Sequence, residues 1–206
     1  MIVAYYTTDY AAEAARLKTS MEALGLPFYT RDVGRRISWL AACHIRPAFL
    51  TVMLEQYGDI LSLDADCIVH SDPMPYMRKL ECDVAVHYLS GHEPLPGTMW
   101  LCPGPASEFF LEIWASLDRV HADRPDRINC AGALEIAAVQ AGLRIARLPP
   151  EYAFIFDTSR DLHPGTEPVI EHLQASRELR LPAAGPKKLI ESRRRYLAAL
   201  DRRAAS

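Results

Sequence analysis

The 206-residue chain, half of it hydrophobic, is long enough for one domain with a sizeable core. Its formal net charge is −3, but seven of its 23 basic residues fall between Pro186 and Ser206, so an acidic body precedes a basic tail. This distribution is not that of a nucleic-acid-binding protein, which carries its positive charge on a folded face.

Two further features of the composition exclude classes of protein. The five cysteines show no C-x-x-C spacing, which argues against a disulfide framework and against a zinc site. No stretch is apolar for long enough to span a bilayer, and the first residues lack the basic start and long apolar core of a signal peptide. We therefore expect a cytoplasmic protein with reduced thiols.

The start of the chain predicts a strand, a helix and a second strand. Residues 2–7 are β-branched and aromatic, and residues 9–24 carry apolar side chains at helical spacing before a glycine. Residues 27–33 predict the second strand, an order typical of nucleotide-binding sheets. Residues 34–57 predict a helical region interrupted at Arg46-Pro47, because proline disfavours helix in the residue before it.

The stretch from Asp59 to Val69 is the most informative part of the chain. Its apolar residues 60–63 predict a short buried strand, which ends in Asp64 and Asp66, separated by one alanine. In an open α/β sheet, ligands bind outside the carboxyl ends of the strands. Two carboxylates there suit Mg²⁺ or Mn²⁺, which also takes oxygen ligands from substrate phosphates.

The rest of the chain alternates predicted helices and strands. The predicted helices are residues 73–80, 108–117 and 129–140, the last capped by Asn129 and closed by Gly142. The predicted strands are residues 83–87, 97–101, 144–148 and a late strand that ends at His172. We expect His87, His92 and Glu93 to fall in a loop that runs to Pro96, and we assign them no metal, because polar residues in a Gly/Pro-rich loop are usually solvated.

Four of these segments together resemble a known family. They are Asp59–Val69 with its D-x-D, the Trp39-x6-Arg46-Pro47 segment before it, Gly97–Leu101, and Val169–Arg177. The chain resembles the GT-A glycosyltransferases over roughly residues 2–177, in particular bacterial nucleotide-diphospho-sugar transferases related to the glycogenin-like group. The resemblance implies a single GT-A-type, Rossmann-like α/β domain in residues 1–185, with a mostly parallel central sheet flanked by helices. A basic helical tail would follow in residues 186–206.

The resemblance also implies a function and a metal site. The protein would be a cytoplasmic, metal-dependent glycosyltransferase that moves a sugar from a UDP- or GDP-sugar to an unknown acceptor. Mn²⁺ or Mg²⁺ would be held by Asp64, Asp66 and His172, since a neutral imidazole is a suitable third ligand beside two carboxylates.

Further roles follow from the same resemblance. The guanidinium of Arg46 would face the diphosphate, because it binds phosphate oxygens with two N–H groups. Gly97 and Thr98 would pass under the donor sugar, where a glycine lets the backbone approach a ligand. The residues assigned to the nucleotide are Tyr5, Tyr6, Thr7, Trp39, Arg46 and Asp64, and those expected to close over the phosphates are Gln174, Ser176 and Arg177.

The chain departs from the family at one functional position. Many relatives have an Asp-Gln pair at the start of the helix predicted here at residues 129–140, whereas this chain has Cys130 and Ala131. Two alternatives follow: Asn129, Asp126 or Glu135 substitutes for the pair, or the activity is altered or lost.

Two other functions, and two roles for the basic tail, stay open from the sequence. A haloacid-dehalogenase-like phosphatase would use Asp64 as its nucleophile, but the chain has no downstream G-D-x-x-x-D. A non-catalytic protein that binds nucleotide sugars would keep the fold alone. The basic tail, with a narrow apolar stripe of Leu189, Ile190, Leu197 and Leu200, is either a solvated helix or a peripheral contact with anionic lipid.

Overall fold

The computed structural model describes residues 1–35, 38–179 and 187–204. Within these ranges the chain forms a six-stranded sheet in the order β2-β1-β3-β6-β5-β7. The strands are β1 (Ile2–Tyr6), β2 (Phe28–Asp32), β3 (Ile60–Leu63), β5 (Val84–Leu89), β6 (Glu93–Leu101) and β7 (Ile145–Arg147). β6 is antiparallel to both of its neighbours, and the other neighbouring pairs are parallel. The predicted mostly parallel sheet is therefore confirmed.

A second, three-stranded sheet contains the strand that carries His172. Its order is β4 (Cys67–Val69), β9 (Ile170–His172) and β8 (Phe154–Ile155), with β9 antiparallel to β4 and parallel to β8. Because β4 follows the D-x-D directly, its pairing with β9 places Cys67 opposite His172. Two parts of the sequence more than a hundred residues apart thus meet beside the aspartates.

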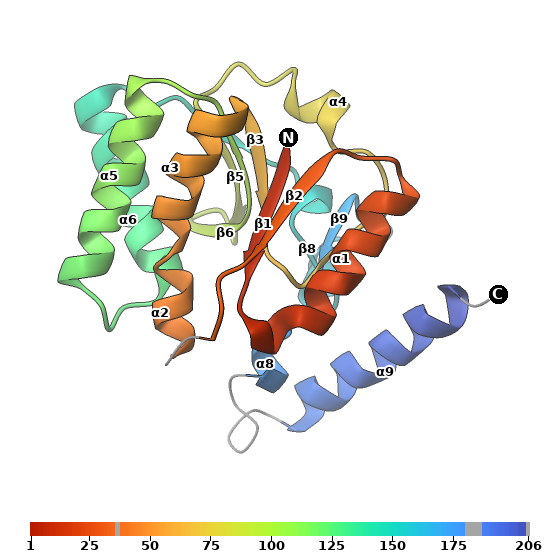
Figure 1. The fold of residues 1–206 in the computed structure, drawn as a ribbon. Helices are drawn as coiled ribbons and strands as arrows, with labels where there is room; N and C mark the ends of the chain where they lie inside the picture. Colours follow the sequence, from red (N-terminus) through yellow and green to blue (C-terminus); the bar gives the residue numbers. More distant parts are fainter. Residues whose placement is uncertain (36–37, 180–186, 205–206) are drawn as a thin grey trace.

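Helices cover both faces of the larger sheet (Figure 1). α3 (Arg46–Tyr57), α5 (Pro105–Val120) and α6 (Asp126–Ala141) pack on one face, and α1 (Ala11–Ala23) packs on the other beside the small sheet. Each face of the sheet has its own hydrophobic core, one under α3, α5 and α6 and the other under α1. Side chains of a strand alternate between them: Val3 of β1 packs in the first core, and Ile2 and Ala4 pack in the second.

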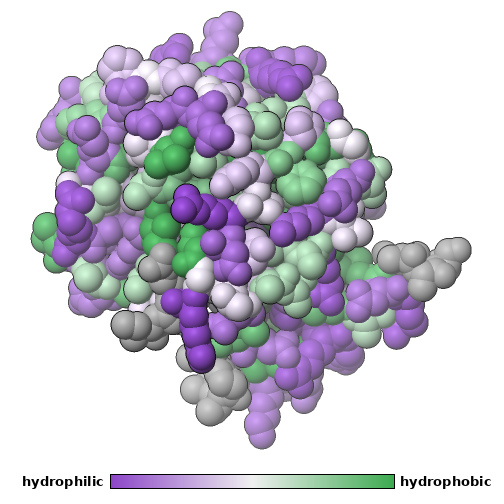
Figure 2. Space-filling model, viewed as in Figure 1, coloured by the Kyte–Doolittle hydropathy of each residue, from purple (hydrophilic) through white to green (hydrophobic). Residues whose placement is uncertain are grey.

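The remaining elements are short, apart from the last helix. They are 3₁₀ turns at Thr8–Tyr10 and Pro150–Tyr152, and the helices α2 (Trp39–Cys43), α4 (Met74–Met77), α7 (Thr158–Leu162), α8 (Ser176–Leu179) and α9 (Lys187–Ala204). None of the described helices has the length and apolarity needed to cross a bilayer. Figure 2 shows that the face seen in Figure 1 is largely hydrophilic, with hydrophobic residues in small separate patches.

The prediction of a loop from His87 to Pro96 was wrong, because β5 continues through His87 to Leu89 and β6 already begins at Glu93. Pro94 and Pro96 have no N–H to donate, which normally keeps proline out of a central strand. Here β3 pairs only with residues 98–101 of β6, so the segment with both prolines extends past the end of β3 and pairs on its β5 side alone. The two prolines therefore disturb no hydrogen bond to β3.

The predicted cap at Asn129 was also wrong. α6 starts at Asp126, one turn earlier, and Pro125 precedes it. The fixed φ of proline suits the start of a helix. Asn129 lies inside the helix, and its Nδ2 donates to Asp118 Oδ1 of α5 at 2.8 Å. Gly142 does close the helix, with a φ of 65°.

Candidate active site

A cavity of about 280 Å³ opens at the edge where β1 and β3 have their carboxyl ends. Eleven of the residues predicted for the site lie in its wall: Tyr5, Tyr6, Thr7, Trp39, Arg46, Asp64, Asp66, Gly97, His172, Gln174 and Ser176. Two others, Thr98 and Arg177, lie outside this wall. The structure thus brings together segments from the first strand to the start of α8.

Asp64 follows the last residue of β3 and is held by the neighbouring strand. Its backbone N–H donates to the carbonyl of Gly97 at 2.8 Å, which continues the pairing of β3 with β6. The carboxylate is 36% exposed, toward the cavity, and its Oδ1 accepts from Arg46 Nη2 at 2.8 Å. Burial alone would raise the pKa of Asp64, but Arg46 and then His172 outweigh it and lower that pKa.

Asp66 is tied to the segment that follows β9. The backbone N–H of Ala175 donates to Asp66 Oδ2 at 2.6 Å, and that of Leu173 donates to the carbonyl of Asp66 at 2.9 Å. Burial, followed by repulsion from Asp64, raises the pKa of Asp66 to about 7. Two neighbouring carboxylates thus have pKa values shifted in opposite directions, as is common in functional sites.

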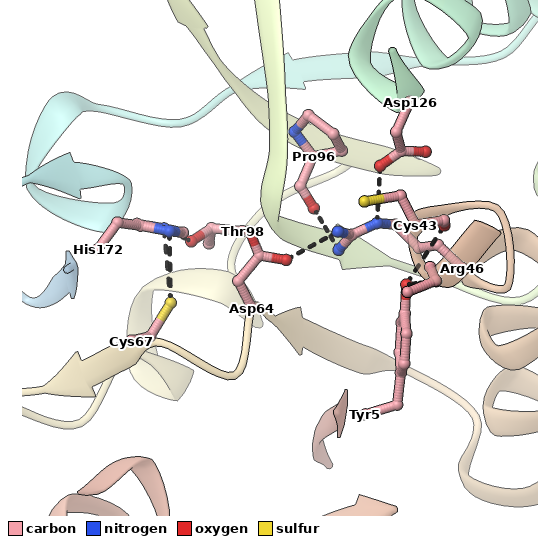
Figure 3. Close-up of polar contacts among 10 residues, drawn as sticks. Tyr5, Cys43, Arg46, Asp64, Cys67, Pro96, Thr98, Asp126 and His172 are labelled. Atoms are coloured by element: carbon pink, nitrogen blue, oxygen red, sulfur yellow. Dashed lines mark hydrogen bonds and ion pairs between the residues drawn. The ribbon is translucent and has the colours of Figure 1, made fainter. Parts of the chain in front are cut away.

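His172 ends β9 with its ring between two neighbours (Figure 3). Its Nε2 lies 2.8 Å from Thr98 Oγ1, and its Nδ1 lies 3.4 Å from Cys67 Sγ. Burial lowers the pKa of His172, which favours the neutral imidazole that ligates metals. Burial likewise raises the pKa of the Cys67 thiol, so Cys67 is a protonated neighbour of the ring.

The structure gathers possible metal ligands around this ring. Donor atoms of Asp66, Cys67 and His172 all lie within 4.8 Å of one another. Asp64 lies outside this set but faces His172, because a Cβ added to Gly97 would meet Asp64 Oδ2 at 2.5 Å and His172 Cε1 at 2.7 Å. The glycine therefore leaves the space in which these two side chains face each other. Cys67 was not predicted, since a cysteine after the D-x-D carries no motif of its own.

Arg46 is buried at the centre of a set of polar contacts (Figure 3). Nε donates to Asp126 Oδ2 at 3.1 Å, Nη1 to the carbonyl of Pro96 at 3.1 Å, and Nη2 to Asp64. The guanidinium also lies over the ring of Tyr5, 5.9 Å from its centroid. The first residue of α3 therefore joins the end of β3, the start of β6 and the start of α6.

Of the three residues considered as substitutes for the missing Asp-Gln pair, Asp126 is the one that reaches the cavity. It lies in the cavity wall, and burial raises its pKa to about 6. Cys130 is fully buried, Asn129 contacts Asp118, and Glu135 is exposed farther along α6. Asp126 is also the one of the three that contacts Arg46. An acidic residue after a proline predicts no more than a helix start, so sequence alone did not single it out.

The residues expected to bind the nucleotide and to close over phosphates differ in what they contact. The Tyr5 hydroxyl donates to the carbonyls of Ala42 and Cys43 at 3.0 and 3.3 Å, so this ring is a fixed part of the wall. Gln174, at a φ of 55°, lines the cavity together with Ser176. Arg177 is instead ion-paired with Asp157.

Comparison with known proteins gives a match at the level of structure only. No protein-family model matches this chain, and no curated protein matches its sequence. Among solved structures, a glycosyltransferase involved in glycosylation of the major capsid of PBCV-1 matches with a TM-score of 0.60 and 13% identity, over 84% of this chain and 92% of its own.

Two other solved structures give the same picture. The galactosyltransferase LgtC, solved with donor and acceptor sugar analogues, matches with a TM-score of 0.52 and 13% identity, over 83% of this chain and 86% of its own. Mouse xyloside xylosyltransferase 1 matches with a TM-score of 0.51 and 11% identity, over 83% and 96%. At these identities the likeness shows the fold. The predicted GT-A fold is confirmed, and the solved structures that share it are glycosyltransferases.

Gly97→Ala should disturb the site directly, because the new methyl group would overlap Asp64 and His172. We expect a loss of about 1–3 kcal/mol in the free energy of unfolding, measured by urea denaturation. Gly104→Ala is the matched control, since a Cβ added there would have no atom within 4 Å and the backbone of Gly104 is extended. Equal stability of the two variants would show that Gly97 has more room than the geometry gives it.

Arg46→Ala should cost about 3–5 kcal/mol of stability, because it leaves the buried carboxyl group of Asp126 without its cationic partner. The Asp126 side chain is only 6% exposed, whereas Asp64 can be hydrated from the cavity. The double variant Arg46→Met, Asp126→Leu removes both charges and should recover most of that loss in urea denaturation. A double variant no more stable than Arg46→Ala would contradict this assignment of the cost.

Proposed function

We propose that this chain, which has the GT-A glycosyltransferase fold, transfers a glycosyl group from a nucleoside diphosphate sugar to an acceptor. The observation that carries the proposal is the convergence of Arg46, Asp64, Asp66 and His172 on one cavity. That cavity lies at the carboxyl ends of β1 and β3, the edge at which sheets of this kind bind ligands.

A divalent cation fits the residues around Asp64 and Asp66. Two carboxylates and a neutral imidazole are donors that suit Mn²⁺ or Mg²⁺, and the absence of a side chain at Gly97 leaves Asp64 and His172 facing each other. We propose Asp64, Asp66 and His172 as the ligands. When bound, the cation would offset the negative charge of the donor's diphosphate.

Arg46 is suited to the diphosphate as well as to the fold. Nη1 and Nη2 each carry a second hydrogen beyond the bonds to Pro96 and Asp64, so the guanidinium can donate to a phosphate oxygen without releasing either partner. A preorganised donor aimed at the leaving diphosphate stabilises the charge that develops there during transfer.

The other residues of the wall suit the rest of the donor. Tyr6 and Trp39 are half-buried aromatic side chains at the cavity and can stack on a base, while Gly97 can pass beneath the sugar. Gln174 and Ser176 can donate to phosphate oxygens from the opposite side. In this proposal Asp126, held by Arg46, replaces the missing Asp-Gln pair at the start of α6.

Asp66→Asn tests the proposal, because it removes the charge but keeps the oxygen that accepts from Ala175. A UDP- or GDP-sugar at a hundred times its dissociation constant, with Mn²⁺, should stabilise the wild type by about 2.7 kcal/mol in a thermal-shift assay. Asp66→Asn should lose the Mn²⁺-dependent part of this stabilisation. Asp161→Asn, an exposed acid on α7, should keep it.

The outcomes separate the competing functions. Stabilisation of Asp66→Asn equal to that of the wild type would remove the D-x-D from the metal site. A wild type that binds a nucleotide sugar but never releases nucleoside diphosphate would be a binding protein. Covalent capture of beryllium fluoride at Asp64 would instead identify a phosphatase.

A further inference from the structure

The last helix, α9, binds the segment that follows His172. The side chain of Arg193 is 4% exposed, and its Nε donates to the carbonyl of Leu173 at 2.8 Å. Its Nη1 donates to Glu178 of α8 at 2.9 Å, and its Nη2 is ion-paired with Glu13 of α1 at 2.7 Å. One buried guanidinium therefore joins α9 to α1, to α8 and to the residue after His172.

A second side chain of α9 binds the residue before His172. The Tyr196 hydroxyl lies 2.8 Å from both carboxylate oxygens of Glu171, which is fully buried. The Tyr196 ring stacks on Phe156 with centroids 5.2 Å apart. Glu171 also accepts from Arg160 of α7 at 2.9 Å and lies 3.0 Å from His70 Nε2, just after β4, so its charge is shared by partners from three parts of the chain.

The segment between these two anchors is the one that closes over Asp66. Leu173 and Ala175 donate their N–H groups to Asp66, and Gln174 between them has a φ of 55°, a conformation that costs about 1–2 kcal/mol for a residue with a side chain. Such a turn persists only where its neighbours hold it. Arg193 does so from the outside, at the carbonyl of Leu173.

The orientation of α9 fits this docked arrangement. Ile190, Leu197 and Leu200 are half-buried on the same side as Arg193, whereas Leu189 is exposed. Figure 1 places α9 beside α1 and α8, and Figure 2 shows a mostly hydrophilic surface over it. Contact between its exposed basic residues and anionic lipid stays a prediction. The apolar stripe largely faces the domain instead.

We propose that α9 is part of the working site and that Arg193 and Tyr196 are positioning residues for His172. They fix the two residues that flank it, Glu171 and Leu173. In this way they hold the imidazole, and the turn at residues 173–175 that donates to Asp66, in position beside Asp64. The role of His172 as a metal ligand rests on the proposed function. The ordering of residues 171–176 by α9 is independent of it.

Amide hydrogen exchange of the metal-free protein tests this ordering. Arg193→Ala should raise exchange in residues 171–176 about tenfold, because it removes a charge-assisted hydrogen bond at Leu173. Arg194→Ala is the matched control: Arg194 pairs with the same Glu178, but its side chain is 66% exposed. Tyr196→Phe, a milder change that keeps the stack on Phe156, should raise exchange at the same residues to a smaller extent.

Mn²⁺ affinity, measured by titration with the ion alone, is the second readout. Arg193→Ala should weaken it about tenfold, while Arg194→Ala should stay within about twofold of the wild type. The proposal is overturned if neither Arg193→Ala nor Tyr196→Phe raises exchange in residues 171–176, or if Arg194→Ala raises it as much. A wild type that binds no Mn²⁺ would overturn the proposed metal site, and the exchange data would still decide the role of α9. If Arg193→Ala does not fold, Tyr196→Phe decides it.

Discussion

The buried guanidinium of Arg46 is the interaction on which the site depends. A buried charge is stable only when its partners are close and well oriented, and Arg46 finds them at Asp64, Pro96 and Asp126. Asp64 follows the last residue of β3, Pro96 precedes Gly97 in β6, and Asp126 is the first residue of α6. Satisfying one cation therefore sets the positions of the D-x-D, of the strand beneath the cavity and of the helix at its rim.

Strand pairing supplies what Arg46 does not. The antiparallel β6 lies between β3 and β5 and brings Gly97 against Asp64, and the pairing of β4 with β9 brings His172 beside Cys67 across 105 residues of sequence. Because strand pairing fixes the distance between neighbouring backbones, the side chains of Asp64 and His172 are held close together by rigid elements. α9 then braces the end of β9 from outside. The site is thus a product of topology as much as of its motif.

Local patterns predicted the parts of this structure that depend on local physics. The early strands, the aspartates at a strand end and the late strand with His172 follow from apolar periodicity, and the fold followed from the resemblance that these segments carry. The extent of β6 was missed, because its prolines are tolerated only where β3 has already ended. The start of α6 was placed too late, because Asn129 is as good a local cap signal as the Pro125-Asp126 pair. Arg193 carries no motif, and Asp126 was one of three candidates that the sequence could not separate. Each is a single charge whose partners come from distant segments, so only the folded chain shows what it contacts.

The most direct test of a metal site built from Asp64, Asp66 and His172 is the effect of Mn²⁺ on the NMR signals of the His172 ring. Paramagnetic broadening falls steeply with distance, so a ligand is affected before other groups. In the presence of a nucleoside diphosphate, substoichiometric Mn²⁺ should broaden the His172 signals, assigned with a His172→Gln variant, in the wild type but not in Asp66→Asn. Sharp His172 signals in the wild type, or equal broadening in both proteins, would contradict the account.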